Sequence, residues 1–342
     1  MGHTMNRLHL GPVSLQLNAV PIAYCLLSFL GLLIISVCTL TFGDLGLRLA
    51  ELPSALFGYS SGKSAFVLER IRGPRLATAI LAGALLGLSG TLFQTVTRNP
   101  LGSPDVIGVG AGAGAGAAIS SLLIPIVPAS VGAVGGAALA TLLVYVFTGR
   151  GFRSSAHIIL ARIGVSTFAY ALTQYVVSTH LHDKAAVLAG YLVGSLNAVN
   201  LCDVTVTGLA LLLLLPTSFA LSTNISLLEI GDEAATGLGV NPDRTRTQAI
   251  VISVIASGTA VSAIGPVAFV ALTAPQIARR LIRSSQVNIA SSALTGALIL
   301  ATADLAAQHL PLLAGLPVGI LTLGIGGLYL GYLLTHEKRK EL

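Results

Sequence analysis

Few residues of this chain could carry out chemistry, because only 9% of its 342 residues are charged. We find no catalytic pair of carboxylates, no histidine cluster and no nucleophile beside a base, which argues against a membrane-embedded enzyme. The cysteines, Cys25, Cys38 and Cys202, form no Cys-x-x-Cys pair, so neither a zinc site nor a redox motif is supported. We therefore expect no catalytic residue, no metal site and no cofactor bound by this chain.

One glycine-rich run superficially resembles a nucleotide-binding loop. From Gly108 to Gly116 glycine alternates with small residues, but no Lys-Ser or Lys-Thr pair follows the run. Small residues at this spacing allow helices in a membrane to approach each other closely, which is the interpretation we favour. Any coupling to ATP must then come from a partner.

Most of the sequence must form elements that lipid can solvate. Hydrophobic residues make up 54% of the chain and charged residues only 9%. Soluble domains carry about 25% charged residues. A helix needs about 20 mostly apolar residues to cross the hydrocarbon core, and open strands are excluded there. We predict an all-α polytopic membrane protein with spans at 20–42, 75–97, 106–126, 129–148, 156–178, 201–221, 247–264, 266–282, 290–308 and 315–335.

The basic residues predict how these spans are oriented. If the N-terminus is cytoplasmic, thirteen of the 19 Lys and Arg residues fall on the cytoplasmic side, which favours both termini inside. Five of the six outside charges lie within 43–75, a concentration that needs its own explanation. The weakly apolar segment 184–199 is expected to be a helix that lies at the membrane surface or partly re-enters the membrane. We expect residues 1–342 to form a single transmembrane domain.

Two polar segments between spans are candidates for function. The turn Arg98-Asn-Pro-Leu-Gly-Ser-Pro-Asp105 contains prolines and glycine that predict irregular backbone, either as a tight connection or as a projection into a pathway. The segment 222–246 contains three acids between Ser226 and Val240, and we predict a short amphipathic helix at roughly 229–237. That helix is either part of a solvated loop or a docking element for a cytoplasmic partner.

From about Arg70 to the C-terminus, the chain resembles the FecCD-type permease subunits of ATP-binding-cassette (ABC) importers for iron–siderophore complexes, haem and cobalamin. The motifs that carry this resemblance stand in order on matching spans: Arg72-Gly-Pro-Arg75, Gly90-x-x-x-Gln94, Arg98-Asn-Pro-Leu-Gly-Ser-Pro-Asp105, Gly190-x-x-x-Gly194-Ser-Leu-Asn197, Gly231-Asp-Glu-Ala…Leu238-Gly239, Gly265-Pro-Val-Ala-Phe-Val-Ala-Leu-Thr-Ala-Pro-Gln-Ile-Ala-Arg-Arg280, Ala303-Asp304 and Leu316-Pro-Val-Gly319. The resemblance implies the type II ABC importer permease fold.

The resemblance also implies roles for residues at the outer face. Arg72 and Arg75 match family arginines that receive acidic residues of a periplasmic or lipid-anchored binding protein, which would explain the outside basic cluster. Gln308 stands near the position of a third family arginine. The family often has histidine where this chain has Gln276, and either side chain can form hydrogen bonds. For Asp304 we expect a structural hydrogen bond between helices.

On the cytoplasmic side, the resemblance implies a gate and a coupling element. The residues that match the family's gate are Asn99, Leu101, Ser154 and Ser155. The residues that match its coupling helix, which sits in a groove of the ATPase, are Glu229, Gly231, Asp232, Glu233, Leu238 and Gly239. Gly239 is expected to end that helix.

Arg162 lies about six residues into the span 156–178. A charge inside a membrane is costly and by default suggests a functional site. One interpretation is that Arg162 faces the pathway and attracts an anionic ferric siderophore. The other is that its side chain extends to the inner interface without a transport role.

Together these features predict the permease subunit of an ATP-driven importer in the cytoplasmic membrane of a bacterium. Its expected cargo is a ferric siderophore, first a catecholate of the enterobactin type, with haem or cobalamin as alternatives. Expected partners are a second, related permease, two ATPase subunits that bind ATP and Mg²⁺, the binding protein and lipid, but no nucleic acid. An ion-coupled secondary transporter is the other class considered, and it would need membrane-embedded acids, of which only Asp304 qualifies clearly.

Overall fold

The computed structural model describes residues 6–10, 13–17, 19–43, 46–56, 59, 62–104, 108–124, 126–148, 155–180, 193–283, 287–313 and 315–338. The ten predicted spans are each occupied by a helix: α1 (Ala19–Thr41), α4 (Gly73–Thr97), α5 (Val109–Leu123), α6 (Ala129–Thr148), α7 (Ser155–His180), α9 (Leu201–Ile230), α11 (Pro242–Ile264), α12 (Val270–Ile282), α13 (Ile289–His309) and α14 (Val318–Lys338). The helical prediction is confirmed. The exception is an antiparallel hairpin of β1 (Asn6–Leu10) and β2 (Val13–Leu17), whose polar and apolar residues alternate with the period of a strand.

Helix lengths separate complete spans from partial ones. Six described helices are long and apolar enough to cross a membrane by length and composition: Ala19–Thr41, Ser64–Thr97, Ala129–Phe147, Leu201–Ile230, Pro242–Ile264 and Ile289–His309. By contrast, α5 has 15 residues and α12 has 13, fewer than the about 20 that a crossing needs. Irregular backbone precedes both helices, and it is tolerated at membrane depth where protein buries it, as at Ser103 and Val267.

The start of α12 differs from the prediction, which placed it at 266. Gly265 and Phe269 have positive φ angles of 75° and 69°, so the chain between them is not helical and α12 begins at Val270. The predicted spans 247–264 and 266–282 imply a break at this point, but the prediction did not include the left-handed conformation of Phe269.

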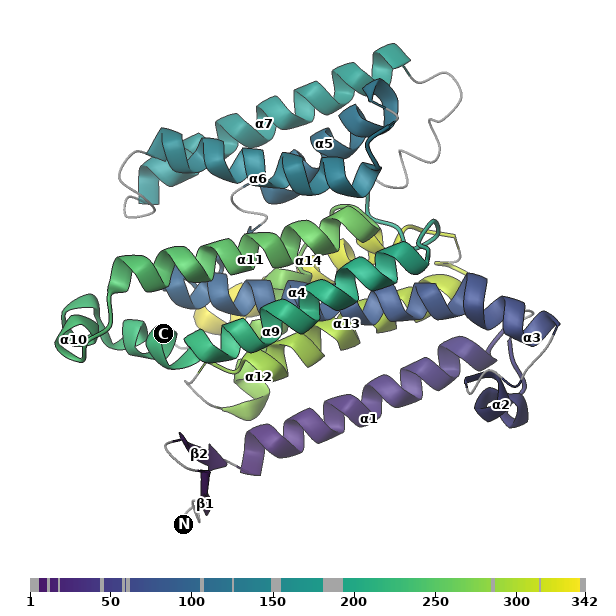
Figure 1. Ribbon diagram of the computed structural model, residues 1–342, viewed down its shortest axis with the longest axis horizontal. Coiled ribbons are helices and arrows are strands. Elements are labelled where there is room, and N and C mark those ends of the chain that lie inside the picture. The colour runs from purple at the N-terminus through teal and green to yellow at the C-terminus, as the bar shows by residue number, and fades with distance from the viewer. Residues whose placement is uncertain are drawn as a thin grey trace.

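Helix α4 lies at the centre of the bundle, packed against α9, α11 and α13 (Figure 1). Most residues of α4 between Pro74 and Val96 are buried. Helices α5, α6 and α7 pack together and contact the rest of the bundle through α11 (Figure 1). This arrangement leaves α7 beside the irregular segments that precede α5 and α12.

The glycine-rich run serves helix packing, as predicted. A Cβ atom at Gly116 of α5 would lie 2.0 Å from the carbonyl oxygen of Gly132 on α6. A Cβ atom at Gly136 would lie 2.1 Å from the carbonyl oxygen of Gly112. The two helices can approach this closely only because neither has a side chain at the contact.

The two ends of the bundle differ in their short elements. The hairpin β1–β2 and the helix α10 (Asp232–Gly237) lie at one end, and α2 (Leu52–Leu56) and α3 (Lys63–Phe66) lie at the other (Figure 1). Between α3 and α4 the chain continues as a π-helical turn, Val67–Arg72. The short elements at the two ends therefore have different neighbours and can contact different partner proteins.

The predicted helix at 229–237 is shorter than expected. Helix α9 continues to Ile230, and Gly231, with a φ of 137°, separates it from α10. The predicted end at Gly239 is confirmed: its φ is 83°, its N–H donates to Thr236 O at 3.0 Å, and Val240 N–H donates to Ala235 O at 3.0 Å. These two bonds form the Schellman motif that commonly closes a helix.

The predicted surface segment 184–199 is described only from Val193 onward. Residues 194–199 are not helical, contrary to the expectation of a helix at the membrane surface. They pack on neighbouring helix ends, where Ser195 N–H donates to Ile264 O at 2.7 Å and Gly319 N–H donates to Gly194 O at 3.0 Å. Asn197, in the same segment, lies near the start of α4, where its side chain accepts a hydrogen bond from Arg75.

Candidate functional site

Arg75, at the start of α4, is held by an acid on α13. Its Nε and Nη2 lie 2.9 Å and 2.8 Å from Asp304 Oδ1, and its Nη1 donates to Asn197 Oδ1 at 2.8 Å. Gln308 Nε2 donates to Asp304 Oδ2 at 2.7 Å. The Asp304 side chain is only 2% exposed. The expected helix–helix hydrogen bond of Asp304 is therefore confirmed, and it takes the form of a buried ion pair.

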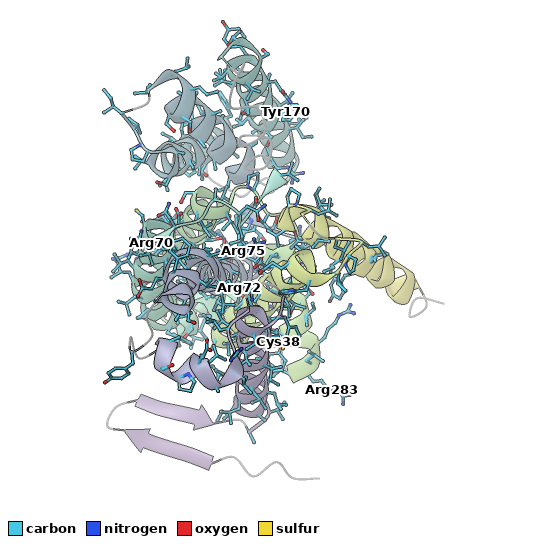
Figure 2. The ribbon with its side chains drawn as sticks, turned by 90° about the vertical axis from the view of Figure 1, so that its right-hand side faces the viewer. Cys38, Arg70, Arg72, Arg75, Tyr170 and Arg283 are labelled. Carbon is cyan, nitrogen blue, oxygen red and sulfur yellow. The ribbon has the colours of Figure 1, made fainter. Side chains whose placement is uncertain are left out.

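Arg72 is also engaged inside the protein. The residue is 7% exposed, and its Nη1 donates to the carbonyl oxygen of Thr39 at the end of α1 at 2.6 Å. Figure 2 looks onto this end of the molecule and shows Arg70 with Arg72 and Arg75. Arg48 and Arg70 are exposed, and neither has an ion-pair partner within the part of the chain that the structure describes. Of these arginines, they are the ones that can reach a partner protein.

The predicted gate residues Asn99 and Leu101 lie in a tight turn directly after α4. Arg98 ends the helix in a left-handed conformation, with a φ of 49°. Asn99 Oδ1 then accepts from Leu101 N–H at 2.9 Å, and the Leu101 side chain is 48% exposed. Ser154 and the side chain of Ser155 lie outside the described residues, so the pairing of gate residues stays a prediction.

Two buried glutamines fasten this turn to α12. Gln276 Nε2 donates to Gln94 Oε1 at 2.7 Å and to Pro100 O at 3.0 Å. Gln94 Nε2 in turn donates to Leu272 O at 2.9 Å. Both glutamines are at most 9% exposed. The motifs identified both side chains, but the contact between them is visible only in the fold.

Substituting Gln276 with leucine should destabilise this contact. The change removes the donor to Pro100 O and leaves the amide oxygen of Gln94 without that partner. An unsatisfied buried polar group costs about 1–3 kcal/mol. We expect a lower midpoint of thermal unfolding for the purified protein in detergent. Gln276→His keeps a donor and is the matched control; equal loss in both variants would contradict the assignment.

At the opposite end of the bundle from α2 and α3, the acids of the coupling segment form ion pairs with arginines of other helices. Asp232 Oδ1 lies 2.5 Å from Arg98 Nη2 and 3.2 Å from Arg246 Nη2. Glu229 Oε1 lies 3.6 Å from Arg279 Nη2 on α12. These pairs link α10 and the end of α9 to α4, α11 and α12.

The remaining coupling residues present a more open face. Glu233 is exposed, and Leu238 is 64% exposed, next to Gly239. Ile230, just before Gly231, is 70% exposed. Large exposed apolar side chains on either side of a short helix are suited to contact with another protein.

The charge of Asp232 is maintained by its neighbours. Partial burial raises the pKa of this carboxyl, but its hydrogen bond to Arg246 and the charges of Arg246 and Arg98 outweigh that effect. The pKa of Asp232 therefore lies below the ordinary value for aspartate. Since the folded-state pKa is lowered, the stabilisation is present above the ordinary pKa and is lost only as the pH falls through the lowered value. The ion pairs are thus intact near neutral pH.

Arg162 lines a cavity of about 510 Å³ between α7 and the irregular segment before α12. The other polar side chains of this cavity are Ser103, Ser166 and Thr167, and Phe269 and Leu272 close it on the α12 side. Ser103 belongs to the segment that also contains Asn99 and Leu101. The cavity thus places one cationic group and three hydroxyl groups next to the predicted gate.

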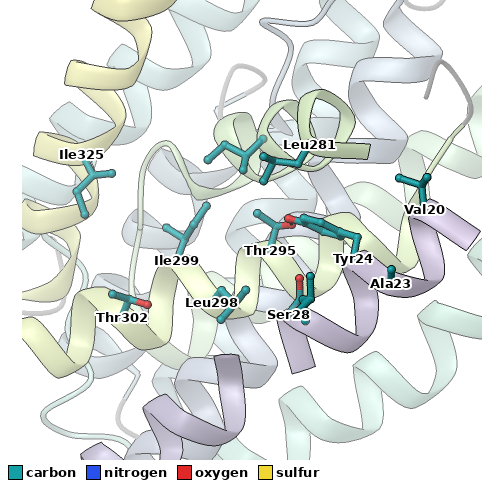
Figure 3. Close-up of a pocket in the computed structure, with 12 residues that line it drawn as sticks. Val20, Ala23, Tyr24, Ser28, Leu281, Thr295, Leu298, Ile299, Thr302 and Ile325 are labelled. Carbon is teal, nitrogen blue, oxygen red and sulfur yellow. The ribbon is translucent and has the colours of Figure 1, made fainter. Parts of the chain in front are cut away.

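A larger cavity, of about 790 Å³, has a different character. It is an apolar groove between α1, α12, α13 and α14, in which Tyr24 Oη hydrogen-bonds Thr295 Oγ1 at 2.7 Å (Figure 3). None of the described residues that line it is charged. This groove offers no charge complementarity to an ionic cargo, in contrast to the cavity at Arg162.

Among the described residues, no group of three His, Cys, Asp or Glu side chains could hold a metal ion.

Comparison with known proteins agrees with this architecture. The FecCD transport family matches residues 31–336. The chain is 33% identical to the ferric enterobactin transport system permease protein FepG of Escherichia coli (strain K12), covering 93% of this chain and 97% of that protein. It is 34% identical to the Fe(3+)-citrate import system permease protein YfmE of Bacillus subtilis (strain 168), covering 91% and 94%.

A solved structure described as an inward-facing conformation of a metal-chelate type ABC transporter aligns with a TM-score of 0.81 at 25% identity. The alignment covers 92% of this chain and 99% of that one. The likeness confirms the predicted permease fold of ABC importers. The chain therefore belongs to the FecCD transport family and is a membrane transport protein rather than an enzyme.

Proposed function

We propose that this chain is one of two permease subunits of an ATP-driven importer that moves a ferric siderophore across the cytoplasmic membrane by alternating access. The observation that carries the proposal is a cavity lined by Arg162 and by the hydroxyl groups of Ser103, Ser166 and Thr167. It lies beside the turn from Asn99 to Gly102, which contains the predicted gate residues and is called the gate turn below. A cation in a cavity at membrane depth attracts an anionic cargo and repels cations. An iron complex with a net negative charge fits this arrangement.

Among iron complexes, we place catecholate siderophores of the enterobactin type first. The support is the similarity to the enterobactin permease over nearly the full length of both chains. A citrate permease is similar to a comparable degree, so ferric citrate is the second candidate, followed by hydroxamate siderophores, haem and cobalamin. Uptake of each radioactively labelled iron complex, measured together with its affinity for the cognate binding protein, separates these candidates.

The proposed partners are the binding protein, two ATPase subunits that bind ATP and Mg²⁺, and a second permease related to this chain. The binding protein is proposed to dock at the end that contains α2 and α3, with Arg48 and Arg70 able to reach it and Arg72 and Arg75 positioning the surface. The ATPase is proposed to receive α10 and the exposed Leu238. We propose that both termini are cytoplasmic; for the N-terminal side, the support is that β1 lies at the same end as α10 (Figure 1).

An ion-coupled secondary transporter finds less support in the same structure. Such a protein needs an acid that exchanges protons or binds cations within the membrane. Asp304 is the acid that qualifies, but its carboxylate is paired with Arg75 and bonded to Gln308. ATP-dependent uptake into vesicles that contain the whole complex would support the importer. Uptake driven by a proton gradient alone would reject it.

Replacing Arg162 with glutamine is expected to reduce uptake of a ferric siderophore about tenfold, if the desolvated charge contributes on the order of 1.4 kcal/mol to attraction of the anion. Arg162→Lys keeps the charge and should retain most of the uptake. The measurement is ATP-driven uptake of labelled chelate by reconstituted complex, with ATP hydrolysis as the control for assembly. Unchanged uptake in Arg162→Gln would show that the side chain has no transport role.

A further inference from the structure

The first residue of α10 joins three helices. Asp232 contacts Arg98, which ends α4, and Arg246 on α11, whose Nη2 lies 3.2 Å from each of its carboxylate oxygens. Arg98 also donates from Nε and Nη2 to the carbonyl oxygen of Leu228 on α9. One carboxylate and one guanidinium group therefore tie the short helix to the end of α4.

Arg98 is the residue immediately before the gate turn. Its left-handed backbone, with a φ of 49°, turns the chain from α4 into Asn99 and Pro100. On its other side the turn is held to α12 by the bond from Gln276 to Pro100 O. The turn is therefore held at one side by α12 and at the other by α10, through the side chain of Arg98.

The two contacts differ in burial. Gln276 is 9% exposed, whereas the Arg98 and Asp232 side chains are each 44% exposed. An ion pair at this exposure contributes little to stability. Arg246 is only 16% exposed and holds the same carboxylate. The pair between Asp232 and Arg98 is therefore suited to move together with α10.

We propose that the Asp232–Arg98 ion pair transmits movement of α10 to the gate turn, so that Asp232 is a positioning residue of the gate rather than a contact for the ATPase. This inference rests on the proposed function of the chain as an ATP-driven permease. In it, Glu233 and Leu238 contact the ATPase, Asp232 pulls on Arg98, and the turn from Asn99 to Gly102 moves relative to Gln276.

The test uses the complete complex in proteoliposomes, with its ATPase and loaded binding protein. The measured quantities are the rate of ATP hydrolysis and the amount of chelate transported per ATP. Asp232→Asn keeps the shape of the side chain but removes its charge. We expect hydrolysis to continue and the transport per ATP to fall about fivefold or more, the range of a typical coupling between sites. Asp232→Glu should restore most of the ratio.

A double-mutant cycle identifies the partner of Asp232. If Asp232 acts through Arg98, then adding Asp232→Asn to an Arg98→Gln protein should change the ratio less than about twofold, since interacting residues are not additive. Asp243→Asn is the matched control: its carboxylate lies 3.8 Å from Arg246 at the start of α11, and we expect it to keep the ratio.

Three outcomes would overturn the inference. They are an unchanged ratio in Asp232→Asn, a parallel loss of hydrolysis and transport, and the same loss in the presence and absence of Arg98→Gln. A wild-type complex without ATP-driven uptake would instead reject the proposed function itself. The two failures are therefore distinguishable in one set of measurements.

Discussion

Replacing Arg75 with methionine is expected to destabilise the protein by about 3 kcal/mol, because Asp304 is left as an unpaired charge that is 2% exposed. Removal of one partner of a buried ion pair costs about 3–5 kcal/mol, and we expect the lower end because 21% of the Arg75 side chain is exposed. The midpoint and free energy of unfolding in detergent are the quantities to measure. Gln308 donates to the same carboxylate but carries no charge and cannot replace the arginine.

Two further variants make this prediction specific. Arg75→Met combined with Asp304→Leu should recover much of the loss, since apolar replacement of a whole buried pair is often close to neutral. Arg70→Met, at an exposed arginine of the same region, should unfold like the wild type. If Arg75→Met is as stable as Arg70→Met, the pair does not contribute to stability. Any loss of binding-protein docking in Arg75 variants must be compared with this unfolding before it is assigned to a lost contact.

A second large effect is expected at the contact between α5 and α6. Gly136→Ala introduces a methyl group 2.1 Å from the carbonyl oxygen of Gly112, and backbone on both sides prevents a simple side-chain adjustment. Overpacking typically costs about 1–3 kcal/mol, and we expect the upper end because the clash is with backbone. The neighbouring residue, Gly135, provides the control: a Cβ atom there meets nothing within 4 Å.

The two alanine substitutions should change the stability of the protein in different directions. Gly135→Ala removes backbone freedom from the unfolded chain and should leave stability unchanged or raise it by up to about 1 kcal/mol. Thermal unfolding of both purified proteins, with helix content followed by circular dichroism, measures the difference. Equal midpoints for Gly136→Ala and Gly135→Ala would show that α5 and α6 do not pack as closely as described.

Predictions that depend on local chemistry were accurate, and those that depend on long-range contacts were incomplete. The end of α10 at Gly239 followed from the conformational freedom of glycine and is confirmed by its φ of 83°. The start of α12 was placed four residues early, because Phe269 adopts a left-handed backbone that its residue type does not suggest. Residues 194–199 were expected to be helical, but hydrogen bonds to α11 and α14 hold them in another conformation.

The sequence by itself determined where the apolar helices lie, because an apolar run of about 20 residues in lipid satisfies its backbone groups by forming a helix. It also identified the residue types at both ends of the bundle through their motifs. Only the tertiary structure decided their partners. Arg75 with Asp304, Gln94 with Gln276 and Arg98 with Asp232 join residues more than 100 positions apart. Such contacts depend on how helices cross and which faces they turn to each other, and neither is encoded in the local pattern of any one span.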